Sequence, residues 1–145
     1  MRVLLLSLVL AACSAPAAVP PADLSPEDEL AQAQAQWADA SLDAYEMTIT
    51  RSCFCPPEWR GPYTATVEEG TMTSFVYVDG PISQGEPPTV EGLFELLETA
   101  YTEGAARVDV TYHEDWGYPV SLYIDKEEMM ADEEIGYTVS ELIQL

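Results

Sequence analysis

Positive charge is scarce in this sequence. Its 145 residues contain five Lys and Arg against 26 Asp and Glu, which gives a formal net charge of −21. Binding to nucleic acid rests on Lys and Arg that neutralise phosphates, and anionic lipid head groups attract the same side chains. The composition therefore argues against both as partners. Solubility explains the acidic charge without a ligand, whereas a functional explanation requires a cationic protein partner or divalent cations.

The N-terminal apolar run is too short to cross a membrane. This run, Val3–Leu10, falls far short of the ~20 residues of a spanning helix. Arg2 precedes it and two alanines follow it, which is the three-part pattern of a secretion signal. The tetrad Leu10-Ala11-Ala12-Cys13 resembles the lipobox of bacterial lipoproteins, in which the cysteine sulfur is acylated before cleavage. Cys13 is thus the expected lipidation site; the alternative is an ordinary signal peptide followed by an incidental cysteine.

Three regions follow from these features. Residues 1–12 are expected to be a lipoprotein signal peptide, and residues 13–24, rich in Ala and Pro, an extended lipid-anchored tether. Residues 25–145 are expected to form a single domain, because this length buries a core without metal or dense disulfides. The predicted location is exported and membrane-anchored in the cell envelope, on its periplasmic or surface side.

Two segments have the pattern of amphipathic helices. Ser25 suits the cap of the first helix, and Pro26 suits its first position. Apolar residues recur along this helix at helical spacing, namely Leu30, Ala33, Trp37, Ala40 and Ala44. Thr89 caps and Gly104 ends the predicted second helix. Its apolar residues are Val90, Leu93, Phe94, Leu97 and Tyr101.

Strands are predicted where apolar and polar residues alternate or β-branched and aromatic residues gather. These segments are residues 45–50, 63–67, 72–78, 108–112, 119–124 and 135–143. Short turns separate them, which predicts an antiparallel sheet of about five to six strands. The predicted fold is α+β, in the order helix, strands, helix, strands, with two helices packed on one face. The two halves share this element order, but no sequence repeat establishes a duplication.

Several motifs together resemble a known family. They are the lipobox, an aromatic strand leading into Cys53-x-Cys55, the helix Val90–Tyr101, Gly117-Tyr118-Pro119 and Asp132-Glu133-Glu134. Through them the chain, from about residue 37 to 139, resembles a family of bacterial lipoproteins known as domain of unknown function 6174. The resemblance implies a cell-envelope location and a single domain. It implies no activity, cofactor or catalytic residue.

Cysteine is rare, and its positions limit its chemistry. Once Cys13 is lipidated, Cys53 and Cys55 remain as an even pair in an oxidising compartment, which favours a disulfide between them. Such a bond requires the two Cα atoms to lie within ~7 Å, and the prolines that follow favour the necessary turn. Two alternatives use the same pair. A thiol-exchange site lacks the helix start that lowers a thiol pKa, and a zinc site needs two further ligands although His113 is the only histidine.

A second candidate site consists mainly of acidic residues. It comprises His113-Glu114-Asp115 and the acidic residues from Asp125 to Glu134. Carboxylate oxygens suit calcium, but the spacing lacks the alternating acids, central Gly and closing Glu of a calcium loop. Solvated turns explain these acids as well. Neither a glycosidase-like pair of carboxylates nor a Ser-His-Asp arrangement is identifiable.

Trp59 and Trp116 are candidate interaction residues. Both lie in segments rich in Gly and Pro, where a large aromatic side chain is not clearly part of a core. Aromatic anchors with a charged rim are typical of protein interfaces. In the alternative interpretation, both side chains fold back over the ends of the sheet.

No catalytic constellation is recognisable, so no enzyme activity and no cofactor are predicted. The leading hypothesis is a non-enzymatic interaction or structural module, displayed on the lipid-anchored tether. A specific version is inhibition of a basic extracellular hydrolase through acidic loops around Trp116. A thiol/disulfide or metal-binding role at Cys53 and Cys55 is the alternative.

Overall fold

The computed structural model describes residues 24–78, 85–130 and 132–145. The predicted signal peptide, the lipidated Cys13 and the tether up to residue 23 lie outside these residues. Residues 79–84 and residue 131 lie outside them as well.

The described residues form the α+β fold that the sequence predicts. The elements are α1 (Pro26–Ala40), β1 (Ala44–Cys53), a short 3-10 helix η1 (Pro57–Trp59), β2 (Tyr63–Glu68), β3 (Thr71–Tyr77), α2 (Val90–Glu103), β4 (Arg107–Tyr112), β5 (Pro119–Asp125) and β6 (Ile135–Gln144). The order helix, strands, helix, strands is therefore confirmed. Neither described α-helix has the length and apolarity of a membrane-spanning helix.

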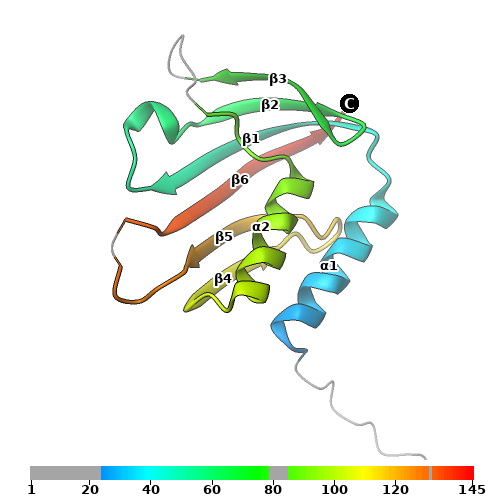
Figure 1. The fold of residues 1–145 in the computed structure, drawn as a ribbon. Helices are drawn as coiled ribbons and strands as arrows, with labels where there is room; N and C mark the ends of the chain where they lie inside the picture. The colour runs from blue at the N-terminus through cyan, green and yellow to red at the C-terminus, as the bar shows by residue number, and fades with distance from the viewer. Residues whose placement is uncertain (1–23, 79–84, 131) are drawn as a thin grey trace, which may run out of the picture.

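The six strands form one antiparallel sheet in the order β3-β2-β1-β6-β5-β4. Every neighbouring pair is antiparallel, so β1, β3 and β5 run in one direction and all finish at the same end of the sheet (Figure 1). Cys53, the last residue of β1, lies opposite Ile135, the first residue of β6. This register places the β1–β2 connection beside the turn between β5 and β6.

Local signals fix the ends of both helices. The Ser25 hydroxyl accepts a hydrogen bond from the Asp28 N–H at 3.2 Å, and the Thr89 hydroxyl accepts one from Gly92 at 3.2 Å. Ser41 adopts a left-handed conformation, with φ 50°, and ends α1. The prediction that Ala44 belongs to the apolar face of this helix is wrong, because Ala44 begins β1 after that cap. Helical spacing of apolar residues shows where a helix ends only if a Gly marks its C-terminal cap. Here a serine, Ser41, adopts the left-handed conformation instead, so the spacing alone extended the helix too far.

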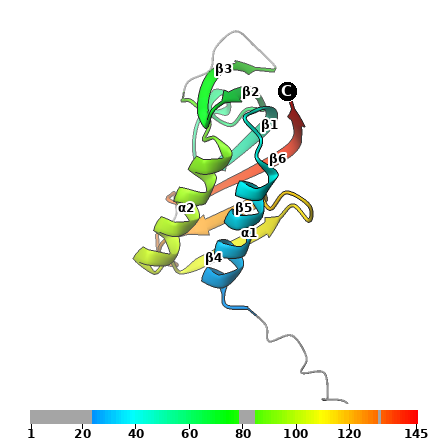
Figure 2. The ribbon, with the colours of Figure 1, turned by 90° about the vertical axis from the view of Figure 1, so that its right-hand side faces the viewer.

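Both helices cover the same face of the sheet (Figure 2). Alternate residues of β1, namely Tyr45, Met47 and Ile49, point to this face and are buried. From α2, Leu93 and Leu97 are completely buried against it. Complete burial of one such leucine stabilises the domain by about 1.5–3 kcal/mol. The opposite face of the sheet is not covered by either helix.

A hydrogen-bond network joins the two helices to the sheet. The Trp37 indole N–H donates to one carboxylate oxygen of Glu91 at 3.0 Å, and the Tyr45 hydroxyl donates to the other at 3.1 Å. The Tyr45 oxygen also accepts from the Val90 N–H at 3.0 Å. Burial raises the pKa of Tyr45, which keeps its phenol neutral and able to donate. Glu91 therefore has a structural role.

The two halves repeat their element order but not their orientation. β1 is antiparallel to β6, β6 to β5, and β5 to β4, so β1 and β4 run in opposite directions. The first hairpin connection of each half, β1–β2 and β4–β5, therefore lies at the opposite end of the sheet from the other (Figure 1).

Candidate functional site

Exposed apolar side chains gather at the end of the sheet where β1, β3 and β5 finish. Six of the nine large apolar residues that are exposed in the described part of the chain lie there. They are Phe54, Trp59, Val76, Val78, Met129 and Met130, and we call this surface the apolar end. Phe54 is 77% exposed and Met129 is 97% exposed. Single exposed apolar residues are normal, whereas a cluster of them is typical of an interaction site.

A small ring holds Phe54 away from the core. Cys53 and Cys55 form a disulfide in the structure, with Cα atoms 5.3 Å apart, as the sequence led us to expect. This separation lies within the range of ordinary disulfides, ~4.4–6.8 Å. Because Cys53 is also paired with Ile135 in the sheet, the ring is fixed at its base. Phe54, the residue between the cysteines, consequently projects outward.

The rest of the β1–β2 connection is held by hydrogen bonds to its own backbone. The Arg60 Nε donates to the Cys55 carbonyl at 3.0 Å, and the Arg60 carbonyl accepts from the Arg51 N–H at 2.6 Å. The Tyr63 hydroxyl donates to the Glu58 carbonyl at 2.8 Å. These bonds order a loop that has little apolar burial of its own. An ordered loop loses less conformational entropy when it binds.

Arg51 packs beneath this connection. Its Nε donates to the Tyr137 hydroxyl at 2.9 Å, and Nη2 donates to the Glu86 carbonyl at 3.3 Å. Burial raises the pKa of Tyr137, and the Arg51 guanidinium partly offsets this rise. Gly85 passes close to this arginine, since a Cβ there would lie 3.3 Å from Arg51 Nη1 and 3.7 Å from Trp59 Cε3. Trp59 is thus partly exposed, and its ring lies close to Gly85.

The apolar end also carries the positive charge of the described chain. Its four cations are Arg51 in β1, Arg60, Arg107 at the start of β4 and Lys126 directly after β5. Arg107 pairs with Asp109 at 2.6 Å and Lys126 with Glu103 at 3.4 Å. Among the described residues, Arg51 and Arg60 have no carboxylate partner. They bond instead to a phenol and to backbone carbonyls.

A shallow hollow lies between these groups. It has a volume of about 250 Å³ and is lined by Phe54, Cys55, Pro56 and Arg60. Three of these residues are apolar, and the fourth brings a guanidinium to the edge. The hollow therefore suits an apolar side chain accompanied by a carboxylate.

The turn between β5 and β6 lies beside the disulfide loop. It begins with Lys126, Glu127 and Glu128, and the Met130 N–H donates to the Glu127 carbonyl at 2.9 Å. Met129 and Met130 follow the acids and are 97% and 50% exposed. Two exposed thioethers thus interrupt the acidic run whose carboxylates were candidate calcium ligands.

Trp116 lies at the other end of the sheet and packs onto its own turn. The His113 ring stacks on Trp116 and on Tyr118, with centroids 5.5 and 4.8 Å apart. His113 Nδ1 accepts from the N–H groups of Asp115 and Trp116 at 3.2 and 3.3 Å. Trp116 is half-buried against the core. The structure therefore separates the two candidate tryptophans, and only Trp59 belongs to the apolar end.

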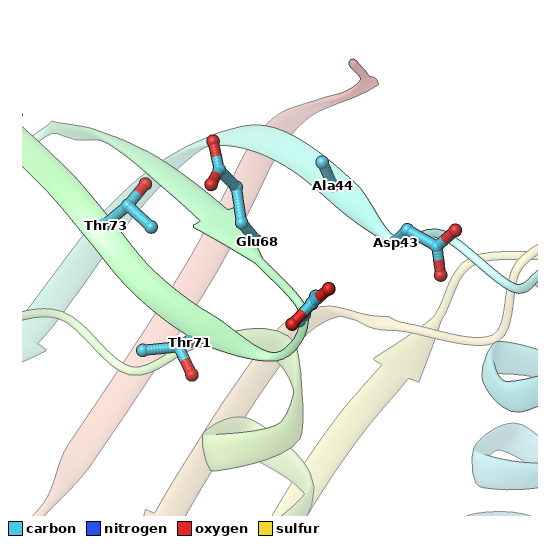
Figure 3. A pocket seen from close by; sticks show the side chains of 6 residues that line it. Asp43, Ala44, Glu68, Thr71 and Thr73 are labelled. Carbon is cyan, nitrogen blue, oxygen red and sulfur yellow. The ribbon is translucent and has the colours of Figure 1, made fainter.

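Carboxylates form a hollow at that other end as well. Asp43, Glu68 and Glu69 line it together with Thr71 and Thr73, and its volume is about 520 Å³ (Figure 3). The carboxylates of Asp43 and Glu68 point away from each other and do not converge on a common point (Figure 3). Across residues 24–78, 85–130 and 132–145, no three His, Cys, Asp or Glu side chains are arranged to hold a metal ion.

Part of the apolar end was predicted from the sequence, namely Cys53, Cys55 and Trp59. Phe54, Arg60 and the methionine pair were not predicted. A phenylalanine between two cysteines and two methionines inside an acidic run were the available signals. Both are unusual for solvated loops, where small and polar residues dominate.

Comparison with known proteins yields one match. No curated protein and no solved structure matches the chain. A model of a family of unknown function, DUF6174, matches residues 29–144, which extend from the first turn of α1 to the last residue of β6. The chain therefore belongs to the DUF6174 family of unknown function.

Proposed function

We propose that this protein is a membrane-anchored lipoprotein of the cell envelope and that its domain is a non-enzymatic interaction module. The lipobox at Leu10–Cys13 supports the anchor. The apolar end supports the interaction, because it combines exposed aromatic and thioether side chains with two arginines that have no carboxylate partner among the described residues. Aromatic residues, Met and Arg are the side chains enriched in protein interfaces.

The observation that carries this proposal is Phe54. A large aromatic residue that is 77% exposed gains no folding energy from its position, yet a disulfide and a strand pairing hold it there. Such an anchor is preorganised for a pocket on a partner protein. The proposed surface differs from the acidic loops around Trp116, since that tryptophan packs on His113 and is not free to insert into a partner.

Truncation of Phe54 tests the interaction. In cells that express the full chain, we expect Phe54→Ala to reduce the yield of chemically crosslinked protein adducts by a factor of ten or more, because loss of a central aromatic anchor costs about 2 kcal/mol or more. Ile143→Ala is the matched control, since Ile143 is 47% exposed but lies near the C-terminus, outside the apolar end. Equal adduct yields from wild type, Phe54→Ala and Ile143→Ala would contradict the proposal.

A thiol role of Cys53 and Cys55 makes a different prediction. If the pair acts chemically, replacing both cysteines by serine abolishes function while Phe54→Ala preserves it. If the pair only positions Phe54, both variants lose the same adducts. The anchor is tested separately by metabolic labelling with an alkyne fatty acid, which Cys13→Ala should abolish.

A further inference from the structure

We propose that the partner at the apolar end is a second copy of this chain, an inference that rests on the proposed interaction function. In this dimer a two-fold axis places the disulfide loop of each copy, residues 53–60, against the β5–β6 turn of the other, residues 126–130. An interface of this isologous kind requires one surface that carries both halves of each contact. The apolar end meets that requirement.

The apolar parts of the two segments are a hollow and an exposed side chain. The hollow beside Phe54 is lined by an aromatic ring, a cysteine and a proline, and has a volume of about 250 Å³. Met129, the most exposed large apolar residue of the described chain, projects from the neighbouring turn. Methionine is unbranched and adaptable, and its sulfur packs favourably against aromatic edges. A Met129 side chain from the second copy therefore fits the hollow.

The charges match as well. Arg60 lies at the edge of the hollow and lacks a carboxylate partner among the described residues, whereas Glu127 and Glu128 immediately precede Met129. A methionine that enters the hollow thus brings two carboxylates toward a guanidinium. Elsewhere, the net charge of −21 opposes contact between copies. The apolar end, which holds all four described cations, is where two copies can meet with opposite charges facing.

The fold places the two segments at the same end of the sheet. Because Cys53 pairs with Ile135, the loop and the turn leave the sheet from adjacent strands at the same end (Figure 1). A half-turn about an axis perpendicular to the strands, along the normal of the sheet, brings the two apolar ends face to face and exchanges the positions of loop and turn, so each arginine faces an acidic turn. Anchoring both copies in one membrane would also raise their effective concentration.

Photocrosslinking tests the dimer in the full, membrane-anchored chain. We place p-benzoylphenylalanine at position 129, at position 54 or, as a control, at position 143, and co-express two epitope-tagged copies of the chain. The expected result is an adduct between copies that joins position 129 of one to residues 53–60 of the other, located by mass spectrometry. Position 143 is expected to give no such adduct.

Charge-reversal substitutions provide a second test of the dimer. Arg60→Glu alone, and Glu127→Arg with Glu128→Arg, should each lower the adduct between copies about tenfold, because like charges then face each other. The variant with all three reversals should recover most of the yield. These residues are exposed, so the folded fraction should not change, which circular dichroism checks. Arg60→Glu also removes the hydrogen bond to the Cys55 carbonyl. The variant with all three reversals lacks this bond too, so recovery of its yield assigns the loss to charge.

The remaining outcomes separate this inference from the proposed function. Adducts of position 54 with a different protein would overturn the second copy as partner and leave the interaction function intact. Adducts of position 54 with residues 141–145 of another copy would overturn the two-fold arrangement. Adducts with lipid alone, or none at any position, would overturn both the dimer and the proposed function.

Discussion

The first hairpin connection of each half contains a tryptophan, but the two connections use their aromatic side chains in opposite ways. In the β4–β5 connection, residues 113–118, the rings of His113, Trp116 and Tyr118 pack on one another, and Trp116 and Tyr118 pack against the core. In the β1–β2 connection, residues 54–62, Phe54 is 77% exposed and Trp59 is 39% exposed. One connection stabilises the fold, and the other presents side chains to a partner.

The means of holding each connection differ accordingly. The β4–β5 connection is ordered by burial, which is possible because Gly117 lets the backbone approach α1 closely. The β1–β2 connection is ordered by a disulfide and by hydrogen bonds to backbone carbonyls, with little burial. A loop that must leave its apolar side chains exposed cannot use them for its own stability. Covalent and polar constraints therefore replace packing there.

The largest effect is expected from Gly117→Ala. Gly117 has φ 74°, and a Cβ there would clash with the Ala33 carbonyl oxygen and lie 2.9 Å from Gln36 Cβ. The clash involves helix backbone, so α1 must move. We expect the free energy of unfolding to fall by about 3–4 kcal/mol, from overpacking together with the left-handed backbone. Urea denaturation followed by circular dichroism measures this loss.

Gly104→Ala is the control for that substitution. Gly104 has a similar φ of 71°, but a Cβ there would have nothing within 4 Å. It should therefore lose only the backbone contribution, about 1 kcal/mol. Equal losses from the two variants would show that the close approach of the β4–β5 connection to α1 does not hold in solution.

The second effect separates stability from interaction. Trp116→Ala should lower the free energy of unfolding by about 2 kcal/mol, because complete burial of such a side chain is worth 3–5 and Trp116 is half-buried. Phe54→Ala should change it by no more than about 0.5 kcal/mol, since the side chain is mostly exposed. The yield of crosslinked adducts should show the reverse order, with a large loss in Phe54→Ala and little change in Trp116→Ala. The comparison of the two connections fails if Phe54→Ala proves the more destabilising variant.

Most of the fold follows from local patterns in the sequence. Ser25, Thr89 and Gly104 mark helix ends, and alternation identifies the strands, so the order of elements and the antiparallel sheet were predictable. The position of Ala44 was not, because the helix is ended by a serine in a left-handed conformation, which sequence patterns rarely indicate. Strand order depends on contacts far apart in the chain, such as that between β1 and β6, which no local pattern contains.

The candidate site was harder to predict for the same reason. The disulfide of Cys53 and Cys55 follows from counting cysteines, but the apolar end combines the ends of three strands. Nothing in the sequence indicates that Phe54 and Met129 lie at one end of the sheet. The sequence treats Trp59 and Trp116 alike, and only packing distinguishes them, since His113 stacks on one and not on the other.

A smaller effect is expected from the combined substitution Cys53→Ser and Cys55→Ser. The closed loop is minimal, so its loss should lower the free energy of unfolding by only about 1.5 kcal/mol. Phe54 would then sample many conformations, and the crosslinked adducts should fall nearly as far as in Phe54→Ala. Adducts at wild-type yield in this variant would show that the ring does not preorganise Phe54, and the contrast between a covalently held and a packed connection would be lost.

The smallest effect concerns two buried tyrosines near the two ends. Burial raises the pKa of both Tyr137 and Tyr118, but only Tyr137 has a guanidinium beside it that favours the phenolate. Arg51→Met removes that charge, so the pKa of Tyr137 should rise further while that of Tyr118 stays the same. Titration of ¹³C-labelled tyrosine by NMR measures both in one sample. An unchanged Tyr137 would mean that Arg51 is turned toward solvent, where its guanidinium would add positive charge to the apolar end instead of bracing the loop above it.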